Sequence, residues 1–390
     1  MALTLDARAL LGADAASANP AANWVGTVGS GAAIGAAKSS AKSAELRADL
    51  LELAAAAGLA PLLQRACAQL QAGRLLALPT ETVYGLAADA DAPEAVARIF
   101  AAKGRPADHP LIVHVAGREP AQWQAAVAHY ASACPDFALR LMAACWPGPL
   151  TLILPRRPGV ASAAAGGQGS IGLRCPAHPV AQAVLLAGQR MGLHGLAAPS
   201  ANRFGRLSPT RAEHVADEFA ALLSDEELLI LDGGPCPVGI ESSIIDCSRS
   251  QPVLLRPGVL PLSALEAAAG QPLAARDAAA PRASGTLSAH YAPRARLRLM
   301  PAAELQAALD LLGPDARHLA LYSRSLLRCA SRHVRVERMP EQASACAHEL
   351  FAVLRALDRP ETRLIWVETP PDDPAWDGVR DRLQRAAAAG

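Results

Sequence analysis

Residues 75–115, LLALPTETVYGLAADADAPEAVARIFAAKGRPADHPLIVHV, decide the fold class. The apolar run that opens this stretch predicts a buried strand, which Pro79 breaks. A helix is predicted over 91–104, with Asp91 as its N-cap and Gly104 at its end. PLIVHVA then predicts the next strand. A strand, a helix and a strand in succession indicate an α/β domain.

The same alternation continues along the chain. TLILP, SIGLR, LLILD and SSIIDCS predict further short strands, separated by Ala-rich helical segments. Their apolar faces are enough for one core that runs to about residue 266, so the main domain is assigned to 59–266.

A second, smaller domain is predicted at the C-terminal end. Residues 267–294 lack periodicity and are rich in Ala, Pro and Gly, which is typical of a linker. Beyond them RLRLM, HLALYS, VRVERM and RLIWVE alternate with helical segments such as ASACAHELFAVLRALD. This pattern predicts an α/β, Rossmann-like domain over 295–390.

Composition narrows the class of protein. The 390 residues are 51% apolar and 19% charged, as expected of a two-domain globular enzyme. Lys and Arg total 37 against 36 Asp and Glu, so no overall basic field drives sequence-blind binding to nucleic acid. Eight scattered cysteines form no CxxC pair, and no apolar run reaches the roughly 18 residues of a membrane span. We therefore expect a cytoplasmic protein with no membrane association.

Residues 1–58 differ from the rest of the chain. Ala, Gly and Ser dominate them, and such a composition buries little side-chain area. Their glycines match neither GxGxxG nor a Walker loop. We predict a low-complexity, disordered leader rather than a nucleotide site.

Four short motifs carry polar side chains suited to a substrate. KGRP places Lys103 and Arg105 where a helix gives way to a loop, and fixed cations there suit a polyphosphate. A basic helix end that complements the helix dipole explains the same residues, and for this motif alone it is the better interpretation. PTETVYGL, APSAN with SPT, and GIESS offer hydroxyls that packing or turn formation also explains.

Taken in order, the motifs are far more specific than any one of them. PTETVYGL, KGRP with PLIVHV, WPGPLTLIL, GLRCPAHP, APSAN with SPT, GIESSIID and LLRPG resemble the YrdC-like threonylcarbamoyl-AMP synthase family over roughly residues 62–262. SAHYAPR in the linker and the segments after it resemble the longer, two-domain form of that family. The resemblance implies a twisted mixed sheet flanked by helices in the main domain.

The resemblance also implies an activity: L-threonine, bicarbonate and ATP are joined into threonylcarbamoyl-AMP with release of pyrophosphate. The product serves threonylcarbamoyladenosine modification of tRNA, through a downstream threonylcarbamoyl transferase complex. Mg²⁺ is the implied cofactor, carried in with ATP, and its protein ligands are not specified. The near-zero net charge predicts that any RNA contact is local or weak.

Site residues follow from the resemblance position by position. The implied catalytic set is Lys103, Arg105, Ser200 and Asn202. The implied ATP-binding set is Arg105, His109, Ser170, Ser200, Ser208, Arg256 and Tyr291. The implied L-threonine-binding set is Thr82, His114, Arg174, Ala198 and Ser242. Tyr291 of SAHYAPR is expected to form part of a lid over the nucleotide.

Three positions depart from the family pattern. His109 stands where Asn is usual, Ser243 replaces a Thr, and Ala87 replaces a Gly, so the backbone at Ala87 must avoid positive φ.

Two other functions compete with synthesis: an RNA-binding module without catalysis, and a hydrolase of acylated nucleotides or carbamoyl phosphates in the same pocket. A serine hydrolase is disfavoured because the sequence has no GxSxG elbow.

Overall fold

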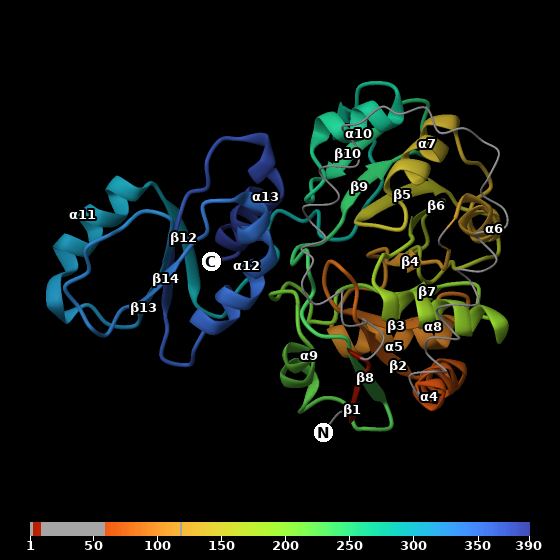
Figure 1. Cartoon of the computed structure of the whole chain (residues 1–390), viewed down its shortest axis with the longest axis horizontal. Coiled ribbons are helices and arrows are strands. Elements are labelled where there is room, and N and C mark those ends of the chain that lie inside the picture. The colour runs from red at the N-terminus through yellow and green to blue at the C-terminus, as the bar shows by residue number, and fades with distance from the viewer. Residues whose placement is uncertain (1–2, 9–58, 118) are drawn as a thin grey trace.

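The computed structural model describes residues 3–8, 59–117 and 119–390. In these ranges the chain forms two α/β domains joined by a linker, with the C-terminal domain on the left of Figure 1. Most of the predicted leader, residues 9–58, lies outside the described residues.

A mixed sheet runs through the main domain. Its strands in spatial order are β1-β8-β2-β3-β7-β4-β6-β5-β9-β10-β11, and both parallel and antiparallel pairs occur, as predicted. In chain order the strands are β1 (Leu3–Asp6), β2 (Leu75–Leu78), β3 (Gly85–Asp89), β4 (Ile112–His114), β5 (Leu150–Pro155), β6 (Ser170–Arg174), β7 (Leu196–Ala197), β8 (Leu228–Asp232), β9 (Ser243–Asp246), β10 (Val253–Arg256) and β11 (Ala274–Ala275).

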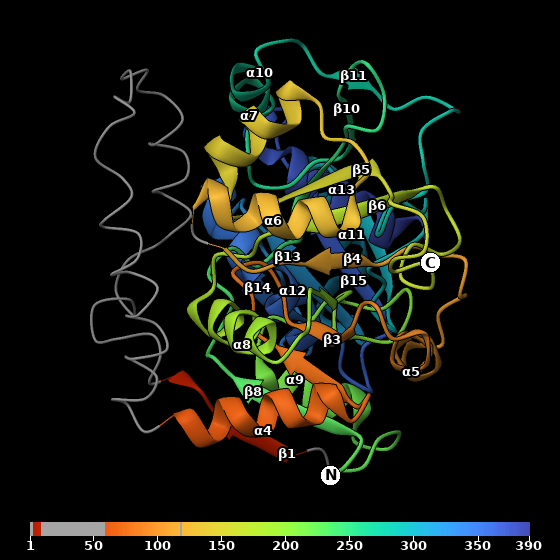
Figure 2. The same ribbon diagram turned by 90° about the vertical axis from the view of Figure 1, so that its right-hand side faces the viewer.

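Helices cover both faces of this sheet. In chain order they are α4 (Ala60–Gln71), α5 (Pro93–Lys103), α6 (Pro120–Tyr130), α7 (Asp136–Cys145), α8 (Pro179–Arg190), α9 (Ala212–Phe219) and α10 (Leu262–Ala269). One apolar core lies between the sheet and α5, α6, α7, α9 and α10, and a second lies between the sheet and α4 with α8. Figure 2 shows α6 in front of the strands and α4 beside β1.

The sequence of β2 explains why the sheet is sandwiched. Leu75 and Ala77 pack into the first core, whereas Leu76 and Leu78 pack into the second. Side chains alternate across a strand, so a strand that is apolar at every position requires cover on both faces.

The C-terminal domain has a four-stranded parallel sheet of order β12-β15-β13-β14. Its strands are β12 (Arg296–Met300), β13 (Leu319–Ser323), β14 (Arg335–Arg338) and β15 (Leu364–Glu368). Its helices are α11 (Ala302–Leu312), α12 (Ala343–Leu357) and α13 (Asp377–Ala387), with short 3-10 turns η2 (Gly313–Asp315) and η3 (Pro374–Trp376). An all-parallel sheet with crossover helices is the predicted Rossmann-like arrangement.

The two domains share one apolar core. Val83, Leu207 and Ile240 of the main domain belong to the same buried cluster as residues of α12 and α13. Tyr291 of the linker lies in this cluster too. The C-terminal domain is therefore packed against the loops that follow the strands of the main sheet.

The structure corrects three expectations. Residues 3–6 of the predicted leader form β1, which pairs in parallel with β8. Asp91 does not cap α5: the N-cap is Ala92, and the Asp91 carboxylate binds His129 and Tyr130 instead. The last helix of the main domain, α10, ends at Ala269 rather than at residue 266.

Two other expectations hold. Gly104 ends α5 in the left-handed conformation, with φ of 61°. Ala87 lies within β3, and it is not among the residues with positive φ. Within the described residues, no helix combines the length and the apolar character that a bilayer crossing needs.

Candidate active site

The turn between β2 and β3 is built by its own side chains. The Thr80 hydroxyl accepts the backbone N–H groups of Thr82 and Val83 at 3.2 Å, and it lies 2.9 Å from the Thr82 hydroxyl. Tyr84 is fully buried and donates to the carbonyl of Gly234 at 2.7 Å. The packing interpretation is therefore right for Tyr84, while Thr80 lines a cavity and Thr82 contacts Thr80.

A small cavity opens beside this turn and gathers loops from distant parts of the chain. Most of the predicted ligand-binding residues reach it. Its lining consists of Thr80, Val83, Gly85, Arg105, Ile112, His114, Arg174, Ala198, Pro199, Ser200, Glu241, Ser242, Arg256, Ser284, Gly285, His290 and Tyr291.

Arg174 forms a buried ion pair at one side of the cavity. It donates to the Glu81 carboxylate at 2.6 Å, and both side chains are about 5% exposed or less. Glu81 also accepts the backbone N–H of Ala177 at 3.1 Å. This carboxylate fixes the direction of the guanidinium, and the Arg174 Nε donates to the carbonyl of Gly148 at 3.3 Å.

His114, on β4, lies in the same lining as Arg174. Burial, assisted by the charge of Arg174, lowers its pKa to about 3, so the imidazole is neutral. Its Nδ1 is buried without a hydrogen-bond partner among the described residues. A buried polar atom of this kind is suited to a ligand that completes its bonding.

Two arginines supply positive charge to the cavity. Arg105 donates to the carbonyl of Pro110 at 2.8 Å and to the Ser284 hydroxyl at 3.1 Å. Arg256 donates to the carbonyl of Ser242 at 2.8 Å and to that of Ser284 at 2.9 Å. Burial lowers the pKa of Arg105 to about 10, which leaves it charged at neutral pH. Ser284 of the linker therefore bridges both cations.

Lys103 does not line the small cavity, but it contacts Ser200 and Asn202, two other members of the predicted catalytic set. Its amine is buried and donates to the carbonyls of Ser200 and Asn202, so it holds the SAN loop to the end of α5. Burial lowers the pKa of this amine well below its usual value. The Asn202 amide nitrogen binds the carbonyls of Arg203 and Arg206, while its Oδ1 is buried without a partner in the described part of the chain.

The other predicted residues surround the cavity without lining it. Ser170 lies in an adjoining pocket that shares Ile112 and Ser284 with the cavity. The Ser208 hydroxyl binds the Glu241 carboxylate, and Thr82 contacts Thr80. His109 packs edge-on against Phe204 with ring centroids 5.3 Å apart.

The linker closes the cavity with a strained turn. Tyr291 has a φ of 60°, which a non-glycine residue rarely adopts, and it is almost fully buried. Gly285 lies so near that an added Cβ would come within 2.1 Å of the Tyr291 hydroxyl. Gly285 and Tyr291 of the linker therefore form part of the cavity wall, and a lid function for this segment stays a prediction.

The C-terminal domain reaches the same place through Arg382 of α13. This guanidinium donates to the Glu241 carboxylate at 2.8 Å and lies 5.4 Å above the Tyr291 ring. Its side chain has no exposed surface. One residue of the second domain therefore contacts both a carboxylate of the cavity lining and Tyr291 of the linker.

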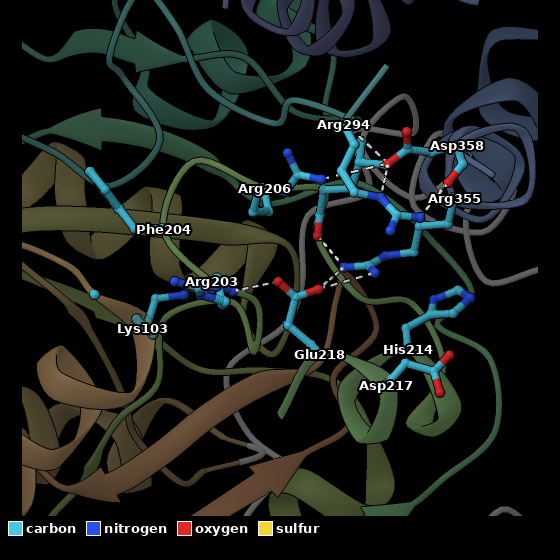
Figure 3. Close-up of a pocket in the computed structure, with 12 residues that line it drawn as sticks. Lys103, Arg203, Phe204, Arg206, His214, Asp217, Glu218, Arg294, Arg355 and Asp358 are labelled. Carbon is cyan, nitrogen blue, oxygen red and sulfur yellow. Dashed lines mark hydrogen bonds and ion pairs between the residues drawn. The ribbon is translucent and has the colours of Figure 1, made fainter. Parts of the chain in front are cut away.

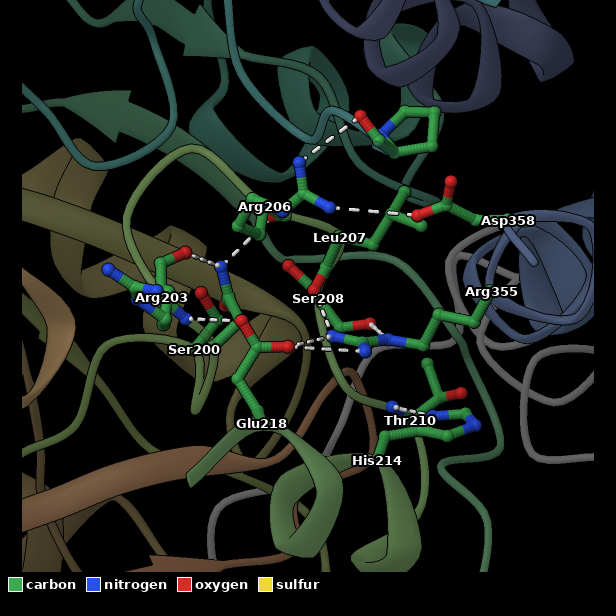
Figure 4. A network of polar contacts seen from close by, with 12 residues as sticks. Ser200, Arg203, Arg206, Leu207, Ser208, Thr210, His214, Glu218, Arg355 and Asp358 are labelled. Atoms are coloured by element: carbon green, nitrogen blue, oxygen red, sulfur yellow. Dashed lines mark hydrogen bonds and ion pairs between the residues drawn. The ribbon is translucent and has the colours of Figure 1, made fainter. Parts of the chain in front are cut away.

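A larger cavity of about 730 Å³ lies between the domains (Figure 3). Its walls are charged, but most charges are paired: Arg355 with Glu218 at 3.3 Å and Arg206 with Asp358 at 3.6 Å (Figure 4). Lys103 lines this cavity, and none of the predicted threonine-binding residues does. Substrate chemistry is therefore assigned to the smaller cavity.

Comparison with known proteins follows the same division into two domains. A family model described as telomere recombination matches residues 68–258, and one described as the threonylcarbamoyl-AMP synthase C-terminal domain matches residues 260–388. The chain is 35% identical over 322 residues to the threonylcarbamoyl-AMP synthase of Pyrococcus abyssi, covering 81% of this chain and 91% of that protein. This chain belongs to the threonylcarbamoyl-AMP synthase family.

Further relatives agree with this assignment. The threonylcarbamoyl-AMP synthase of Bacillus subtilis is 34% identical over 344 residues, which is 84% of this chain and 93% of that protein. A crystal structure of P. abyssi Sua5 complexed with L-threonine superposes with a TM-score of 0.73 at 33% identity, covering 84% of this chain and 94% of that one. The family assignment and the predicted fold class are therefore confirmed.

Nine residues of the cavity lining were not among the predicted site residues, and four of these, together with Glu81, form the polar part or the linker part of the site. The four are Glu241, Ser284, Gly285 and His290, and Glu81 lies behind Arg174. Glu81 and Glu241 lie inside the quoted motifs, as acidic residues in otherwise apolar or hydroxyl-rich runs. A charged residue flanked by buried strands is itself a signal, because such a charge needs a partner.

Proposed function

We propose that this chain is an L-threonylcarbamoyladenylate synthase, which makes threonylcarbamoyl-AMP and pyrophosphate from L-threonine, bicarbonate and ATP. One observation carries the proposal: a single buried cavity holds Arg174, oriented by Glu81, together with Arg105 and Arg256. An oriented guanidinium suits an amino-acid carboxylate, and a pair of buried cations suits a polyphosphate. The name of the P. abyssi relative, threonylcarbamoyl-AMP synthase, and the crystal structure of P. abyssi Sua5 with L-threonine support L-threonine and ATP as the substrates.

The reaction needs no covalent bond to the protein. The threonine nitrogen bonds to the carbon of bicarbonate with loss of water, giving a carbamate. A carbamate oxygen then bonds to the α-phosphorus of ATP, and the bond between that phosphorus and the bridging oxygen of pyrophosphate breaks. Catalysis then consists of positioning and of charge stabilisation, with Arg105 and Arg256 beside the departing pyrophosphate.

The surroundings of the amine suit the first step. His114 is a neutral imidazole with an unpartnered Nδ1, so it adds no positive charge that would disfavour a cationic amine. We propose that His114 with Ser242 holds the threonine amine and hydroxyl end, while Arg174 binds the carboxylate. A carbamate hydrolyses readily, so enclosure of this cavity protects the intermediate.

We propose Mg²⁺ as the cofactor, bound mainly through the phosphates of ATP. The carboxylate in the cavity lining, Glu241, is already bound to Ser208 and Arg382, so it makes a poor additional ligand. Ser200 in the cavity lining and Asn202 in the same loop, whose buried Oδ1 has no hydrogen-bond partner among the described residues, would be the protein oxygen donors for the ion. The ion would neutralise phosphate charge.

ATP entry requires the linker to move. Ser284 accepts hydrogen bonds from both Arg105 and Arg256, and the Tyr291 hydroxyl accepts from Arg256 at 3.5 Å. We propose that residues 282–291 leave these cations when ATP binds and then close over the nucleotide, as expected of a lid.

The remaining assignments are also proposals. Use of bicarbonate, and delivery of the product to a tRNA threonylcarbamoyl transferase complex, follow from the chemistry of the proposed product. All eight cysteines lie in the described ranges and none is in a disulfide, which supports a reducing, cytoplasmic location.

Product analysis tests the proposal directly. Purified protein is incubated with ATP, Mg²⁺, L-threonine and ¹³C-labelled bicarbonate, and nucleotides are analysed by mass spectrometry. We expect an AMP adduct that carries threonine and one ¹³C atom. Arg105→Lys keeps a charge but loses the two-point donor, and should form the adduct at least tenfold more slowly. Unlabelled AMP or ADP as the sole product would refute the proposed function.

A further inference from the structure

A cluster of two histidines and an aspartate lies outside the proposed active site. Asp91 is in the turn between β3 and α5, His129 is at the C-terminal end of α6, and His194 lies just before β7. None of the three lines the cavity described above. Segments far apart in the sequence therefore bring three metal-ligating side chains together.

The three side chains face one another. His129 Nε2 lies 3.0 Å from Asp91 Oδ2, and His194 Nδ1 lies 3.7 Å from the same oxygen. One possible ligand atom from each residue falls within 4.8 Å of the others. Among the described residues, Asp91, His129 and His194 are the group of three His, Cys, Asp or Glu side chains whose ligand atoms lie this close together.

The surroundings favour a cation. Asp91 Oδ1 is buried and has no hydrogen-bond partner among the described residues, so part of the carboxylate's bonding capacity is unused. Asp89 is near enough to Asp91 and His194 for their charges to act on its pKa, so a second carboxylate adds to the local negative field. The ion pairs of Asp91 within the described chain are with the two histidines rather than with Lys or Arg.

We propose that Asp91, His129 and His194 bind one divalent transition-metal ion of the zinc class. Two imidazoles and one carboxylate suit Zn²⁺, Ni²⁺ and Co²⁺, whereas Mg²⁺ and Ca²⁺ prefer oxygen ligands alone. A cavity of about 370 Å³ adjoins His129 and His194, which gives water space to complete the coordination.

Metal binding requires one side chain to turn. The two imidazole rings are stacked, with centroids 3.7 Å apart and planes 2° apart, and a metal ion binds in the plane of each ring. His194 is 56% exposed, so its ring turns toward Asp91 without displacing packed side chains. His129 and Asp91 already point at each other.

A bound ion would connect three elements next to the proposed active site. Gly195 follows His194 and is packed so tightly that an added Cβ would lie 2.9 Å from the Tyr130 hydroxyl and 3.0 Å from the carbonyl of His114. β7 then pairs with β4 at His114. The ion would therefore fix α6 to the start of β7, and its expected effect is on stability.

Calorimetric titration of the full chain with ZnCl₂, in a non-thiol reductant, tests the site. We expect one equivalent to bind, His194→Ala to weaken binding at least about tenfold, and His333→Ala, which removes another exposed histidine, to leave it unchanged. Saturating Zn²⁺ should also raise the Tm of the wild type and not that of His194→Ala.

Absorption of the Co²⁺ complex separates this site from the cysteines. Imidazole and carboxylate ligands give no thiolate-to-cobalt charge-transfer band, and we expect none. Three results would overturn the proposal. They are a thiolate band, equal affinity in wild type and His194→Ala, and no binding by the wild type at about 1 mM metal, a concentration that detects even weak complexes. His194 is exposed, so its variant tests binding without a folding defect.

Discussion

At the scale of single residues, the buried pair of Arg174 and Glu81 connects stability to substrate binding. An arginine that binds a carboxylate substrate must be held in place while some of its N–H donors stay free for that substrate. Glu81 accepts from one terminal nitrogen and from the backbone of Ala177, which leaves the guanidinium fixed in direction. The pair is fully desolvated, so removing one member leaves an uncompensated charge.

We predict that Glu81→Gln lowers the free energy of unfolding by about 3–5 kcal/mol and raises the KM for L-threonine roughly tenfold. The KM for ATP should change little, because Arg105 and Arg256 are not bound to Glu81. Urea unfolding and steady-state kinetics measure both effects. Glu213→Gln, in an exposed ion pair, is the matched control. An unchanged KM for threonine would contradict the assigned role of Arg174.

Buried histidines predict how stability depends on pH. Burial lowers the pKa values of four of them, to about 3 or 4: His114, His178, His214 and His290. The unfolded chain binds their protons near pH 6.5 and the folded chain does not. Stability is therefore complete above about pH 6.5 and is lost as the pH falls from there toward 4.

His178→Asn should reduce this loss. Asn keeps the N-cap of α8, where His178 accepts the N–H of Val180, but it does not titrate. The variant should lose about 1.4 kcal/mol less per pH unit than the wild type between pH 6 and 5. Urea unfolding at both pH values gives the comparison, with His333→Asn as an exposed control. Equal slopes for the three proteins would refute the buried-histidine explanation.

Single residues also show where prediction from sequence ends. Arg105, Arg174 and Arg256 were predicted, and all three meet in one cavity. Lys103 was predicted beside them, but its amine is directed to the carbonyls of the SAN loop. The direction of a buried amine depends on which acceptors the fold brings near, and residue spacing does not contain that information.

At the scale of elements, most strands were predicted from their apolar runs, and β1 and β7 were missed. β2, β4, β5, β6, β8 and the four strands of the C-terminal domain fall on the predicted runs. β1 was missed because it lies in a stretch whose overall Ala, Gly and Ser composition predicted a leader, and β7 was missed because two residues are too few for a period to be recognised. Pairing with β8 or β4 determines them, and pairing is a tertiary property.

β1 is predicted to contribute to stability. Leu3 and Leu5 pack on the core beneath α4, Ala7 donates to the carbonyl of Asp232, and Arg8 forms an ion pair with Asp232. Leu5→Ala should lower the free energy of unfolding by about 1 kcal/mol and the Tm by roughly 2 °C, because it removes partly buried apolar surface. Thr4→Ala, on the exposed side of the strand, should change neither in a thermal melt. Equal melting of both variants and wild type would contradict β1 as part of the sheet.

At the scale of the whole molecule, the C-terminal domain is part of the site's support. Arg382 binds Glu241 through two donors and also reaches the carbonyl of Pro257. It lies against the Tyr291 ring, so the linker packs on a surface to which both domains contribute. The sequence predicted the second domain but not this contact, because a single arginine in a helix is usually a surface residue.

We predict that Arg382→Lys leaves the protein folded and lowers kcat at least tenfold, with a smaller effect on the KM values. Lys retains the charge and loses the fork that holds Glu241 and supports Tyr291. Arg380, on the same helix, forms ion pairs within its own domain, so Arg380→Lys is the control and should keep normal kinetics. An unchanged kcat in a folded Arg382→Lys enzyme would show that the second domain does not act on the site.

Pyrophosphate release from ATP is the measurement that tests the central claim most directly. Wild-type protein is assayed with Mg²⁺, leaving out L-threonine or bicarbonate in turn. The proposed synthase releases pyrophosphate when both are present and loses nearly all of this release when either is left out, since the attacking carbamate needs both. Release at the same rate without threonine would contradict synthesis and would indicate a nucleotide hydrolase.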